Sequence, residues 1–233
     1  MSNLGKLSHY LGIEVKQSTG CIEPKQSAYA KKISEKAGMG VCNPRKYPMD
    51  HKDIISKDEG GVMVDTTQFK SLVGGLHYLV HTRLDIAFSV GIVNRFMEKP
   101  TTVHLNAAKR ILRYIKGTLN FGLVYSKHNI NNVQTGYSDS DLAGQIEDRK
   151  NTSGMVFYLN ESLITWVSQK QRCVVLSSCD AEFMTVITAA CQGEIIVKHV
   201  STDMQRANTL MKALTVVKFE KMRRLLGIKN LHG

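Results

Sequence analysis

Long apolar runs and a leader segment are both lacking in this sequence of 233 residues. No stretch approaches the roughly 18 consecutive apolar residues that a membrane-spanning helix requires, so we expect no contact with a membrane. Residues Met1 to Lys6 contain no basic segment that leads into an apolar one, which is the pattern of a secretory signal. These absences predict an intracellular protein of the cytoplasm or nucleus that is not secreted.

Cysteine is sparse, and its spacing forms no motif. The five cysteines include no CxxC pair, whereas zinc ribbons need such spacing and disulfide scaffolds are denser in cysteine. They therefore read as free or buried thiols in a reducing compartment. His77 and His81 lie four residues apart on an expected helix, but the adjacent glutamate of the metalloprotease motif is missing. We favour a structural role for both histidines.

Acidic residues are outnumbered, since 31 lysines and arginines face 20 aspartates and glutamates, for a net charge of +11. Such a balance suits a polyanionic partner, and nucleic acid is the usual one. The alternative is a basic protein without such a partner. The length suggests one or two domains, and a hydrophobic content of 42% is enough for a core. No internal repeat or low-complexity tract is present.

Local patterns in the first half predict a hairpin followed by helices. Two apolar strands, 10–15 and 21–23, flank a turn at 18–20, and Ser27 is placed to cap a helix that ends at Gly38. Helical periodicity continues beyond Thr66 and dominates up to a stop at Gly117. The expected helices there are a first one from Thr66, a second over 86–97 and a third over 105–116.

The third of these helices carries a row of cations beside its apolar face. Lys109, Arg110, Arg113 and Lys116 could contact a phosphate backbone, each adding a salt-sensitive increment to binding. The alternative is the solvated face of an ordinary amphipathic helix. A later segment, 216–226, predicts a short basic amphipathic helix on the surface.

The stretch 134–192 predicts successive strands that lead into one helix. Apolar runs at 155–159 and 163–167 suit a hairpin, and a third run at 173–176 precedes a helix start at Ser177. The end of the first strand would then carry Asp139 and Asp141, and the inward edge of the helix would carry Glu182.

Clustered carboxylates repel one another unless a cation or a shared proton offsets them. Mg²⁺ is the usual cation, and a pair of such ions about 4 Å apart can activate water against a phosphodiester. The alternative is that these three are ordinary surface acids at turns and a helix start. Spacing alone favours this second reading.

Three motifs that follow one another in the sequence favour the metal-binding interpretation of these acids. Residues 136–144 (GYSDSDLAG), 148–154 (DRKNTSG) and 176–182 (LSSCDAE) closely resemble the ribonuclease H domain of copia-type retrotransposon Pol polyproteins. The resemblance implies an α/β (α+β) fold with a ribonuclease H-like mixed sheet over 135–233. It also implies that Asp139 and Glu182 hold Mg²⁺, that Asp141 assists these catalytic groups, and that the reaction is hydrolysis of RNA in RNA–DNA hybrids.

The sequence departs from the family after Gln192. A strand ending in a catalytic aspartate, and the helix after it, are missing, so the resemblance implies an internal deletion before the segment 193–202, which resembles the family's final strand. In the motif at 207–214 (ANTLMKAL), Asn208 and Met211 replace an aspartate and a threonine of the family. An amide carries no negative charge, so we expect weak catalysis or none, and we expect the loss of a central strand to weaken independent folding of this half.

The first half resembles the end of a copia-type reverse transcriptase. Residues 4–14 look like the region just after the catalytic palm, and 69–75, 82–88 and 107–118 look like its thumb and connecting region. The resemblance implies a helical thumb/connection-like region over 1–127 that grips nucleic acid. The polymerase aspartate pair is not in this sequence, so a partner could be an upstream reverse-transcriptase segment.

Two further hypotheses remain beside the hydrolase. One is a nucleic-acid-binding module without catalysis, and the other is a translated relic with no selected activity. The basic residues expected to bind an RNA–DNA hybrid or other nucleic acid are Lys109, Arg110, Arg113, Lys116, Arg149, Lys150 and Lys212.

Overall fold

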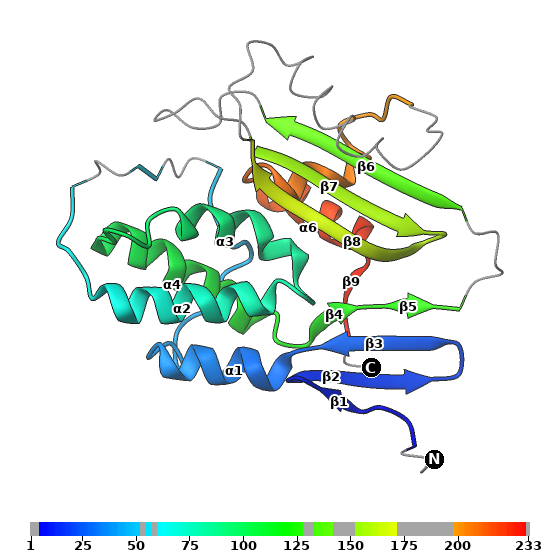
Figure 1. Cartoon of the computed structure of the whole chain (residues 1–233), viewed down its shortest axis with the longest axis horizontal. Coiled ribbons are helices and arrows are strands. Elements are labelled where there is room, and N and C mark those ends of the chain that lie inside the picture. Colours follow the sequence, from blue (N-terminus) through cyan, green and yellow to red (C-terminus); the bar gives the residue numbers. More distant parts are fainter. Residues whose placement is uncertain are drawn as a thin grey trace.

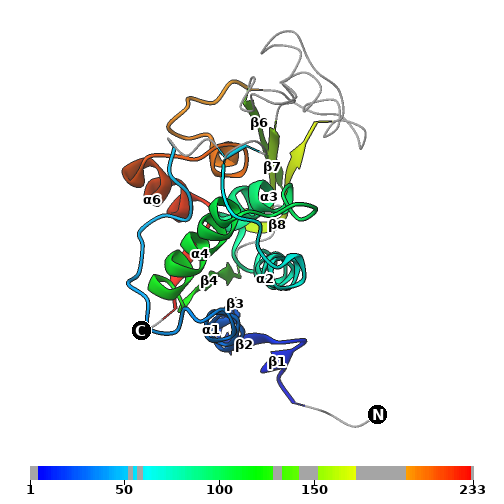
Figure 2. The same ribbon diagram turned by 90° about the vertical axis from the view of Figure 1, so that its left-hand side faces the viewer.

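Helices α2 (Thr66–Leu79), α3 (Ala87–Asn94) and α4 (Thr102–Gly117) form a layer beside two groups of β-strands in the computed structural model (Figure 1). The three-stranded sheet lies at the upper right of Figure 1, beside α3, and Figure 2 shows the first strands and α1 (Ser27–Lys36) below α2, α3 and α4. The structure thus has the mixed helix and strand character that the sequence predicts, and all the strand pairs in its described part are antiparallel. The described residues are 5–51, 55–56, 60–127, 133–141, 152–171 and 198–231.

The first sheet is built on the expected hairpin. Strands β2 (Ile13–Ser18) and β3 (Cys21–Lys25) pair from Ser18 opposite Cys21, which leaves a two-residue turn whose Gly20 has φ +81°. Glycine adopts that angle without steric cost, so this turn closes the hairpin. Short strands β1 (His9–Tyr10) and β5 (Tyr125–Ser126) complete the order β1-β2-β3-β5.

Helix α1 (Ser27–Lys36) begins where the sequence predicts, but Ser27 does not cap it. The Ser27 hydroxyl donates to the Leu119 carbonyl at 2.9 Å, and Gln26 occupies the cap position without a side-chain bond. The Ala28 N–H instead donates to the Glu14 carboxylate at 2.8 Å. A carboxylate from the hairpin therefore satisfies a free amide of this helix, as capping requires.

Three helices form the central layer. They are α2 (Thr66–Leu79), α3 (Ala87–Asn94) and α4 (Thr102–Gly117). The helices expected from Thr66 and over 105–116 are confirmed. The one expected over 86–97 is shorter at both ends, because the 3-10 turn η1 (Leu84–Ile86) includes its first residue and the chain turns after Asn94. None of the described helices has the length and apolar character needed to cross a bilayer.

The second sheet contains the predicted hairpin. Strands β6 (Gln134–Asp141), β7 (Thr152–Leu159) and β8 (Ser162–Lys170) pair in the order β6-β7-β8, with Leu159 opposite Ser162. Asn160 turns the chain with φ +57°, a conformation that asparagine tolerates better than most residues. The strand expected at 173–176 and the helix expected from Ser177 lie outside the described residues.

The last part of the chain returns to the helical layer. It comprises η2 (Arg206–Leu210), α6 (Val216–Leu225) and β9 (Ile228–Asn230), which pairs with β4 (Phe121–Leu123). The helix over 216–226 is confirmed as an amphipathic surface helix, because Val217 is 81% exposed on one face while Phe219 and Met222 are buried on the other. Residues 198–202 form no strand, contrary to the expectation for the described part of 193–202.

Both main apolar clusters contain side chains from each side of the expected boundary at 127–135. One cluster joins the central helices to Leu214, Phe219 and Met222. The other joins Leu84 and Leu123 to side chains of the second sheet and of the last segment, which are Val156, Tyr158, Leu163, Leu210, Leu226 and Ile228. The division into 1–127 and 135–233 stays a prediction, and so does the ribonuclease H-like arrangement with a deletion.

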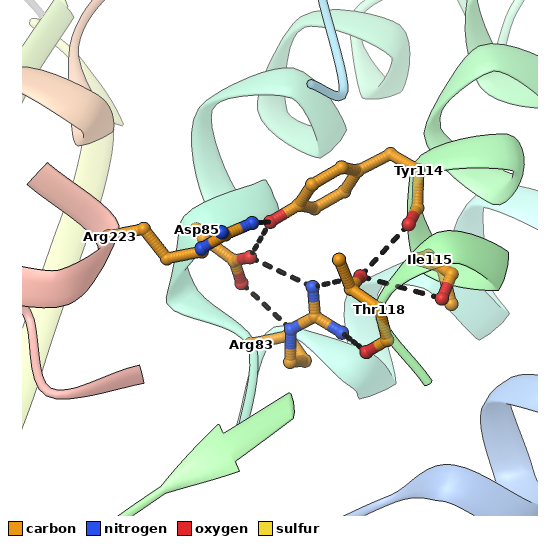
Figure 3. Close-up of polar contacts among 6 residues, drawn as sticks. All are labelled: Arg83, Asp85, Tyr114, Ile115, Thr118 and Arg223. Atoms are coloured by element: carbon orange, nitrogen blue, oxygen red, sulfur yellow. Dashed lines mark hydrogen bonds and ion pairs between the residues drawn. The ribbon is translucent and has the colours of Figure 1, made fainter. Parts of the chain in front are cut away.

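Buried charged groups join α6 to η1 and α4 (Figure 3). The Arg83 guanidinium donates twice to Asp85, at 3.0 and 2.8 Å, and also reaches the Thr118 carbonyl and hydroxyl. The Tyr114 hydroxyl donates to Asp85 and accepts a hydrogen bond from Arg223 at 3.0 Å. We call Arg83, Asp85, Tyr114 and Arg223 the buried polar cluster.

The charge of Asp85 is maintained by its neighbours. Burial by itself would raise the pKa of this carboxyl, but the charge of Arg83, hydrogen bonds from Arg83 and Tyr114 and the charge of Arg223 outweigh burial and hold the pKa below its ordinary value. Burial and the adjacent carboxylate raise the pKa of Tyr114. Tyr114 therefore stays protonated and keeps its donor directed at Asp85.

Replacing Tyr114 by phenylalanine tests the buried polar cluster. The change removes a donor from Asp85 and an acceptor from Arg223, so we expect it to lower the free energy of unfolding by about 1 to 3 kcal/mol. Tyr10→Phe is the matched control, since Tyr10 is 60% exposed and its loss of a hydroxyl should cost less than about 0.5 kcal/mol. Urea unfolding followed by far-UV circular dichroism and by Trp166 fluorescence measures both variants, and equal midpoints for the two would contradict this assignment.

Candidate functional site

Strand β6 places Asp139 two residues before its end, directly opposite Gly154 of β7. Opposed residues of an antiparallel pair share one face of the sheet, and Gly154 in turn lies opposite Ser168 of β8. Asp139 is half-buried, and its Oδ1 accepts the Ser140 N–H at 2.9 Å. Asp141 ends the same strand, and Glu182 lies outside the described residues.

The short helix η2 packs on this face of the sheet. The Ser168 hydroxyl donates to the Leu210 carbonyl, and the Gln205 amide donates to the Ser138 carbonyl at 3.0 Å. A Cβ placed on Gly154 would lie 2.7 Å from the Ala207 carbonyl oxygen. Only a glycine allows such an approach, so η2 contacts all three strands at the level of Asp139.

Asn208 lies within η2 and is completely buried. Its Nδ2 donates to the Thr202 carbonyl at 3.1 Å, while its Oδ1 finds no hydrogen-bond partner among the described residues. Met211, the other substituted motif position, is also buried. The structure thus brings the strand that carries Asp139 together with the segment that carries Asn208, although 69 residues separate the two in sequence.

The described residues do not form a metal centre by themselves. They include no group of three or more histidine, cysteine, aspartate or glutamate residues that could hold an ion. Of the three expected acids, Asp139 is the one whose side chain the structure describes. The neutral amide of Asn208 is a weaker ligand than a carboxylate for a hard cation such as Mg²⁺. We therefore derive no chemical step through a metal ion from these residues.

Three of the four expected cations of α4 are engaged by the loop that follows α1. Arg110 approaches Asp50 at 3.3 Å, the Arg113 Nε donates to the Asn43 carbonyl at 2.7 Å, and the Lys116 Nζ donates to the Gly40 carbonyl at 2.6 Å. These contacts stabilise residues 40–50 against the helix. Phosphate binding by these three stays a prediction, and it would compete with the intramolecular contacts.

The structure describes two of the other expected nucleic-acid contacts, Lys109 and Lys212. Both are half-buried, Lys109 on α4 and Lys212 after η2, and the ammonium group of neither forms a hydrogen bond or ion pair with the part of the chain that the structure describes. Arg149 and Lys150 lie outside the described residues.

Arg206 is a site residue that sequence reasoning missed. Its guanidinium lies 4.9 Å from the Tyr137 ring centre and 4.6 Å from the Tyr158 ring centre, and the two rings meet edge to face. Such contacts contribute roughly 0.5 to 2 kcal/mol each, so Arg206 helps to hold η2 on the sheet. No local pattern indicates this role, because the rings lie 48 and 69 residues earlier in the chain.

Comparison with known proteins adds an independent line of information. A family model described as reverse transcriptase (RNA-dependent DNA polymerase) matches residues 1–51. The retrovirus-related Pol polyprotein from transposon RE1 of Arabidopsis thaliana is 36% identical over 191 residues, which are 82% of this chain and 13% of that protein. The Pol polyprotein from transposon TNT 1-94 of Nicotiana tabacum is 34% identical over 194 residues, 79% of this chain and 14% of that protein.

A shorter relative covers a similar range. An uncharacterised mitochondrial protein of Arabidopsis thaliana is 37% identical over 191 residues, which are 82% of this chain and 79% of that protein. The chain therefore spans most of this relative but only about one seventh of the two Pol polyproteins. No solved structure matches the chain.

Gly154→Ala tests the close packing of η2 on the sheet. The new methyl group would overlap the Ala207 carbonyl and the Leu210 side chain, so we expect a loss of about 1 to 3 kcal/mol in unfolding free energy. Gly74→Ala is the control, because a Cβ there meets nothing within 4 Å and helix propensity should stabilise it by up to about 1 kcal/mol. The urea concentration at the midpoint of unfolding is measured for both variants and compared with that of the wild type. Equal shifts in the two variants would show that η2 does not pack on Gly154.

Proposed function

This chain belongs to the family of copia-type retrotransposon Pol polyproteins, and from that membership we propose that it binds RNA–DNA hybrids but hydrolyses their RNA strand slowly or not at all. The reaction that the resemblance implies is magnesium-dependent hydrolysis of the RNA strand. Asp139 and Glu182 are its proposed metal ligands, with Asp141 in an assisting role.

The buried amide of Asn208 is the observation that carries the proposal. The resemblance assigns this position to an aspartate, and η2 holds Asn208 on the face of the sheet to which Asp139 belongs. Two divalent ions bring four positive charges, which carboxylates offset and an amide oxygen does not. With one carboxylate fewer at this face, a pair of ions would be bound weakly, and hydrolysis would be slow.

Hybrid binding does not require those ions. The net charge of +11 attracts a polyanion over a Debye length of roughly 8 to 10 Å, and each phosphate contact releases condensed counterions. Lys109 and Lys212 are our first candidates for such contacts, since their ammonium groups are not used by the described residues. Arg110, Arg113 and Lys116 follow them, because their donors already hold residues 40–50.

Restoring the carboxylate tests the catalytic part. We expect wild-type protein to cleave the RNA strand of a labelled hybrid at a rate near background, even at a Mg²⁺ concentration high enough to fill weak sites. Asn208→Asp should raise the cleavage rate by about tenfold or more, which corresponds to about 1.4 kcal/mol of transition-state stabilisation. Adding Asp139→Asn to that variant should abolish the gain. Rapid Mg²⁺-dependent cleavage by the wild type would contradict the proposal.

Salt dependence tests the binding part. Hybrid affinity should fall steeply with salt, and Lys109→Gln should reduce the slope of log K against log[salt] by about 0.7 to 0.9 if this lysine contacts one phosphate. Lys31→Gln is the control with the same change of charge, because Lys31 is not an expected nucleic-acid contact and its ammonium group lies 4.0 Å from the Glu35 carboxylate. Asp139→Asn should leave the affinity unchanged. Fluorescence anisotropy of a labelled hybrid measures all four proteins, and absence of hybrid binding by the wild type would reject this proposal.

A further inference from the structure

A cleft of about 680 Å³ lies between the helical layer and the edge of the second sheet. The end of α2 and the turn after it contribute His77, Tyr78 and His81, α3 contributes Gly91, and β8 contributes Ile164 and Trp166. Figure 1 shows α2, α3 and β8 converging on this region. The volume falls within the range of small-ligand sites in proteins, roughly 300 to 1,000 Å³.

Planar rings dominate the chemistry of this cleft. The Tyr78 hydroxyl donates to the Leu11 carbonyl, which holds this side chain in place. Its ring also meets two others edge to face, with ring-centre distances of 4.9 Å to Tyr29 and 5.8 Å to His81. Trp166 is half-buried on the opposite wall, and the neighbouring Ile164 side chain is 47% exposed. Rings fixed before a ligand arrives lose little entropy on binding, which favours a flat aromatic ligand.

The charge of the cleft favours a ligand that carries phosphate. No aspartate or glutamate is among the described residues that line it, and the chain as a whole carries +11. A phosphate beside the entrance would therefore meet no carboxylate from the lining, and the overall charge would raise the local concentration of polyanions. A planar ring joined to a phosphate describes a nucleotide.

We propose that this cleft binds unpaired nucleobases of a single nucleic-acid strand, by stacking on Tyr78 and Trp166. A base within a duplex is already stacked and paired, so a frayed end or an overhang beside a hybrid supplies the occupant. Stacking on aromatic side chains tolerates every base, because each base has a π-face. The assignment rests on the proposed function, since it adds a single-strand site to a hybrid-binding protein.

The experiment fills the cleft and compares three nucleic acids. Gly91 lies in α3, and a Cβ there meets nothing within 4 Å, so Gly91→Phe introduces a ring into open space. Val217→Phe is the control, because Val217 is 81% exposed on α6 and does not line the cleft. The ligands are a thymidine oligonucleotide, a blunt RNA–DNA hybrid and the same hybrid with a thymidine overhang. Anisotropy of the labelled nucleic acid gives the affinities, and Trp166, the sole tryptophan, reports occupancy by fluorescence quenching.

We expect the oligonucleotide to quench Trp166 and Gly91→Phe to weaken its binding by roughly 5- to 150-fold, the range for loss of one stacked base. The overhang should strengthen hybrid binding in the wild type and in Val217→Phe but not in Gly91→Phe. The blunt hybrid should bind all three proteins equally. Ile164→Glu, which places an acid on an exposed wall, should reproduce the selective loss if Gly91→Phe fails to fold.

Two results would overturn the assignment in different ways. Unchanged single-strand binding in Gly91→Phe and Ile164→Glu, with blunt-hybrid binding intact, would reject the cleft and leave the proposed function standing. Absence of binding by the wild type to all three nucleic acids would reject both. An equal loss for single strand and blunt hybrid would also reject the cleft, because it would indicate general damage instead of a single-strand site.

Discussion

The buried polar cluster is the constraint on which the rest of this structure depends. Two guanidinium groups and one carboxylate lie out of contact with water, with Arg83 and Asp85 exposed by 3% and 1%. Charges in such a place are tolerated only when paired and hydrogen-bonded, and removal of one partner typically costs 3 to 5 kcal/mol. Arg83, Asp85 and Tyr114 come from the helical layer, whereas Arg223 comes from α6. The cluster is therefore complete only when both parts of the chain have assembled.

The position of α6 also determines the position of the candidate site. Five residues separate η2 from α6, and Leu210 of η2 packs in the same apolar cluster as Leu84, which begins η1. From this position η2 reaches the sheet, where Gly154 leaves room for its backbone. Arg206 then covers two tyrosine rings of β6 and β7. The surroundings of Asp139 are thus linked, through η2 and α6, to charged groups in another part of the molecule.

Local patterns predicted the elements of this fold well, because hairpins and amphipathic helices follow from residues close together in sequence. The β2–β3 and β7–β8 hairpins and the helices from Thr66 and Val216 are examples. Errors arose where a partner comes from elsewhere in the chain. The acceptor at the start of α1 is Glu14 instead of the local Ser27. The hydrogen bond from Arg223 of α6 to Tyr114 was not predicted, because the two residues are distant in sequence. Resemblance indicated that positions 139 and 208 belong to one site, but spacing could not, since the pairing of β6 with β7 and the docking of η2 are both long-range.

The contribution of α6 to the central apolar cluster also affects how the chain emerges during synthesis. Tyr114 and Arg223 are 109 residues apart, so at roughly 5 to 20 residues per second the ribosome needs about 5 to 20 s to supply the second after the first. During that interval the part of α4 around Tyr114, whose ring Phe219 later meets edge to face, lacks this contact. The nascent chain is then a substrate for chaperones and prone to self-association. The order of translation, as well as the final contacts, therefore limits the yield of folded protein.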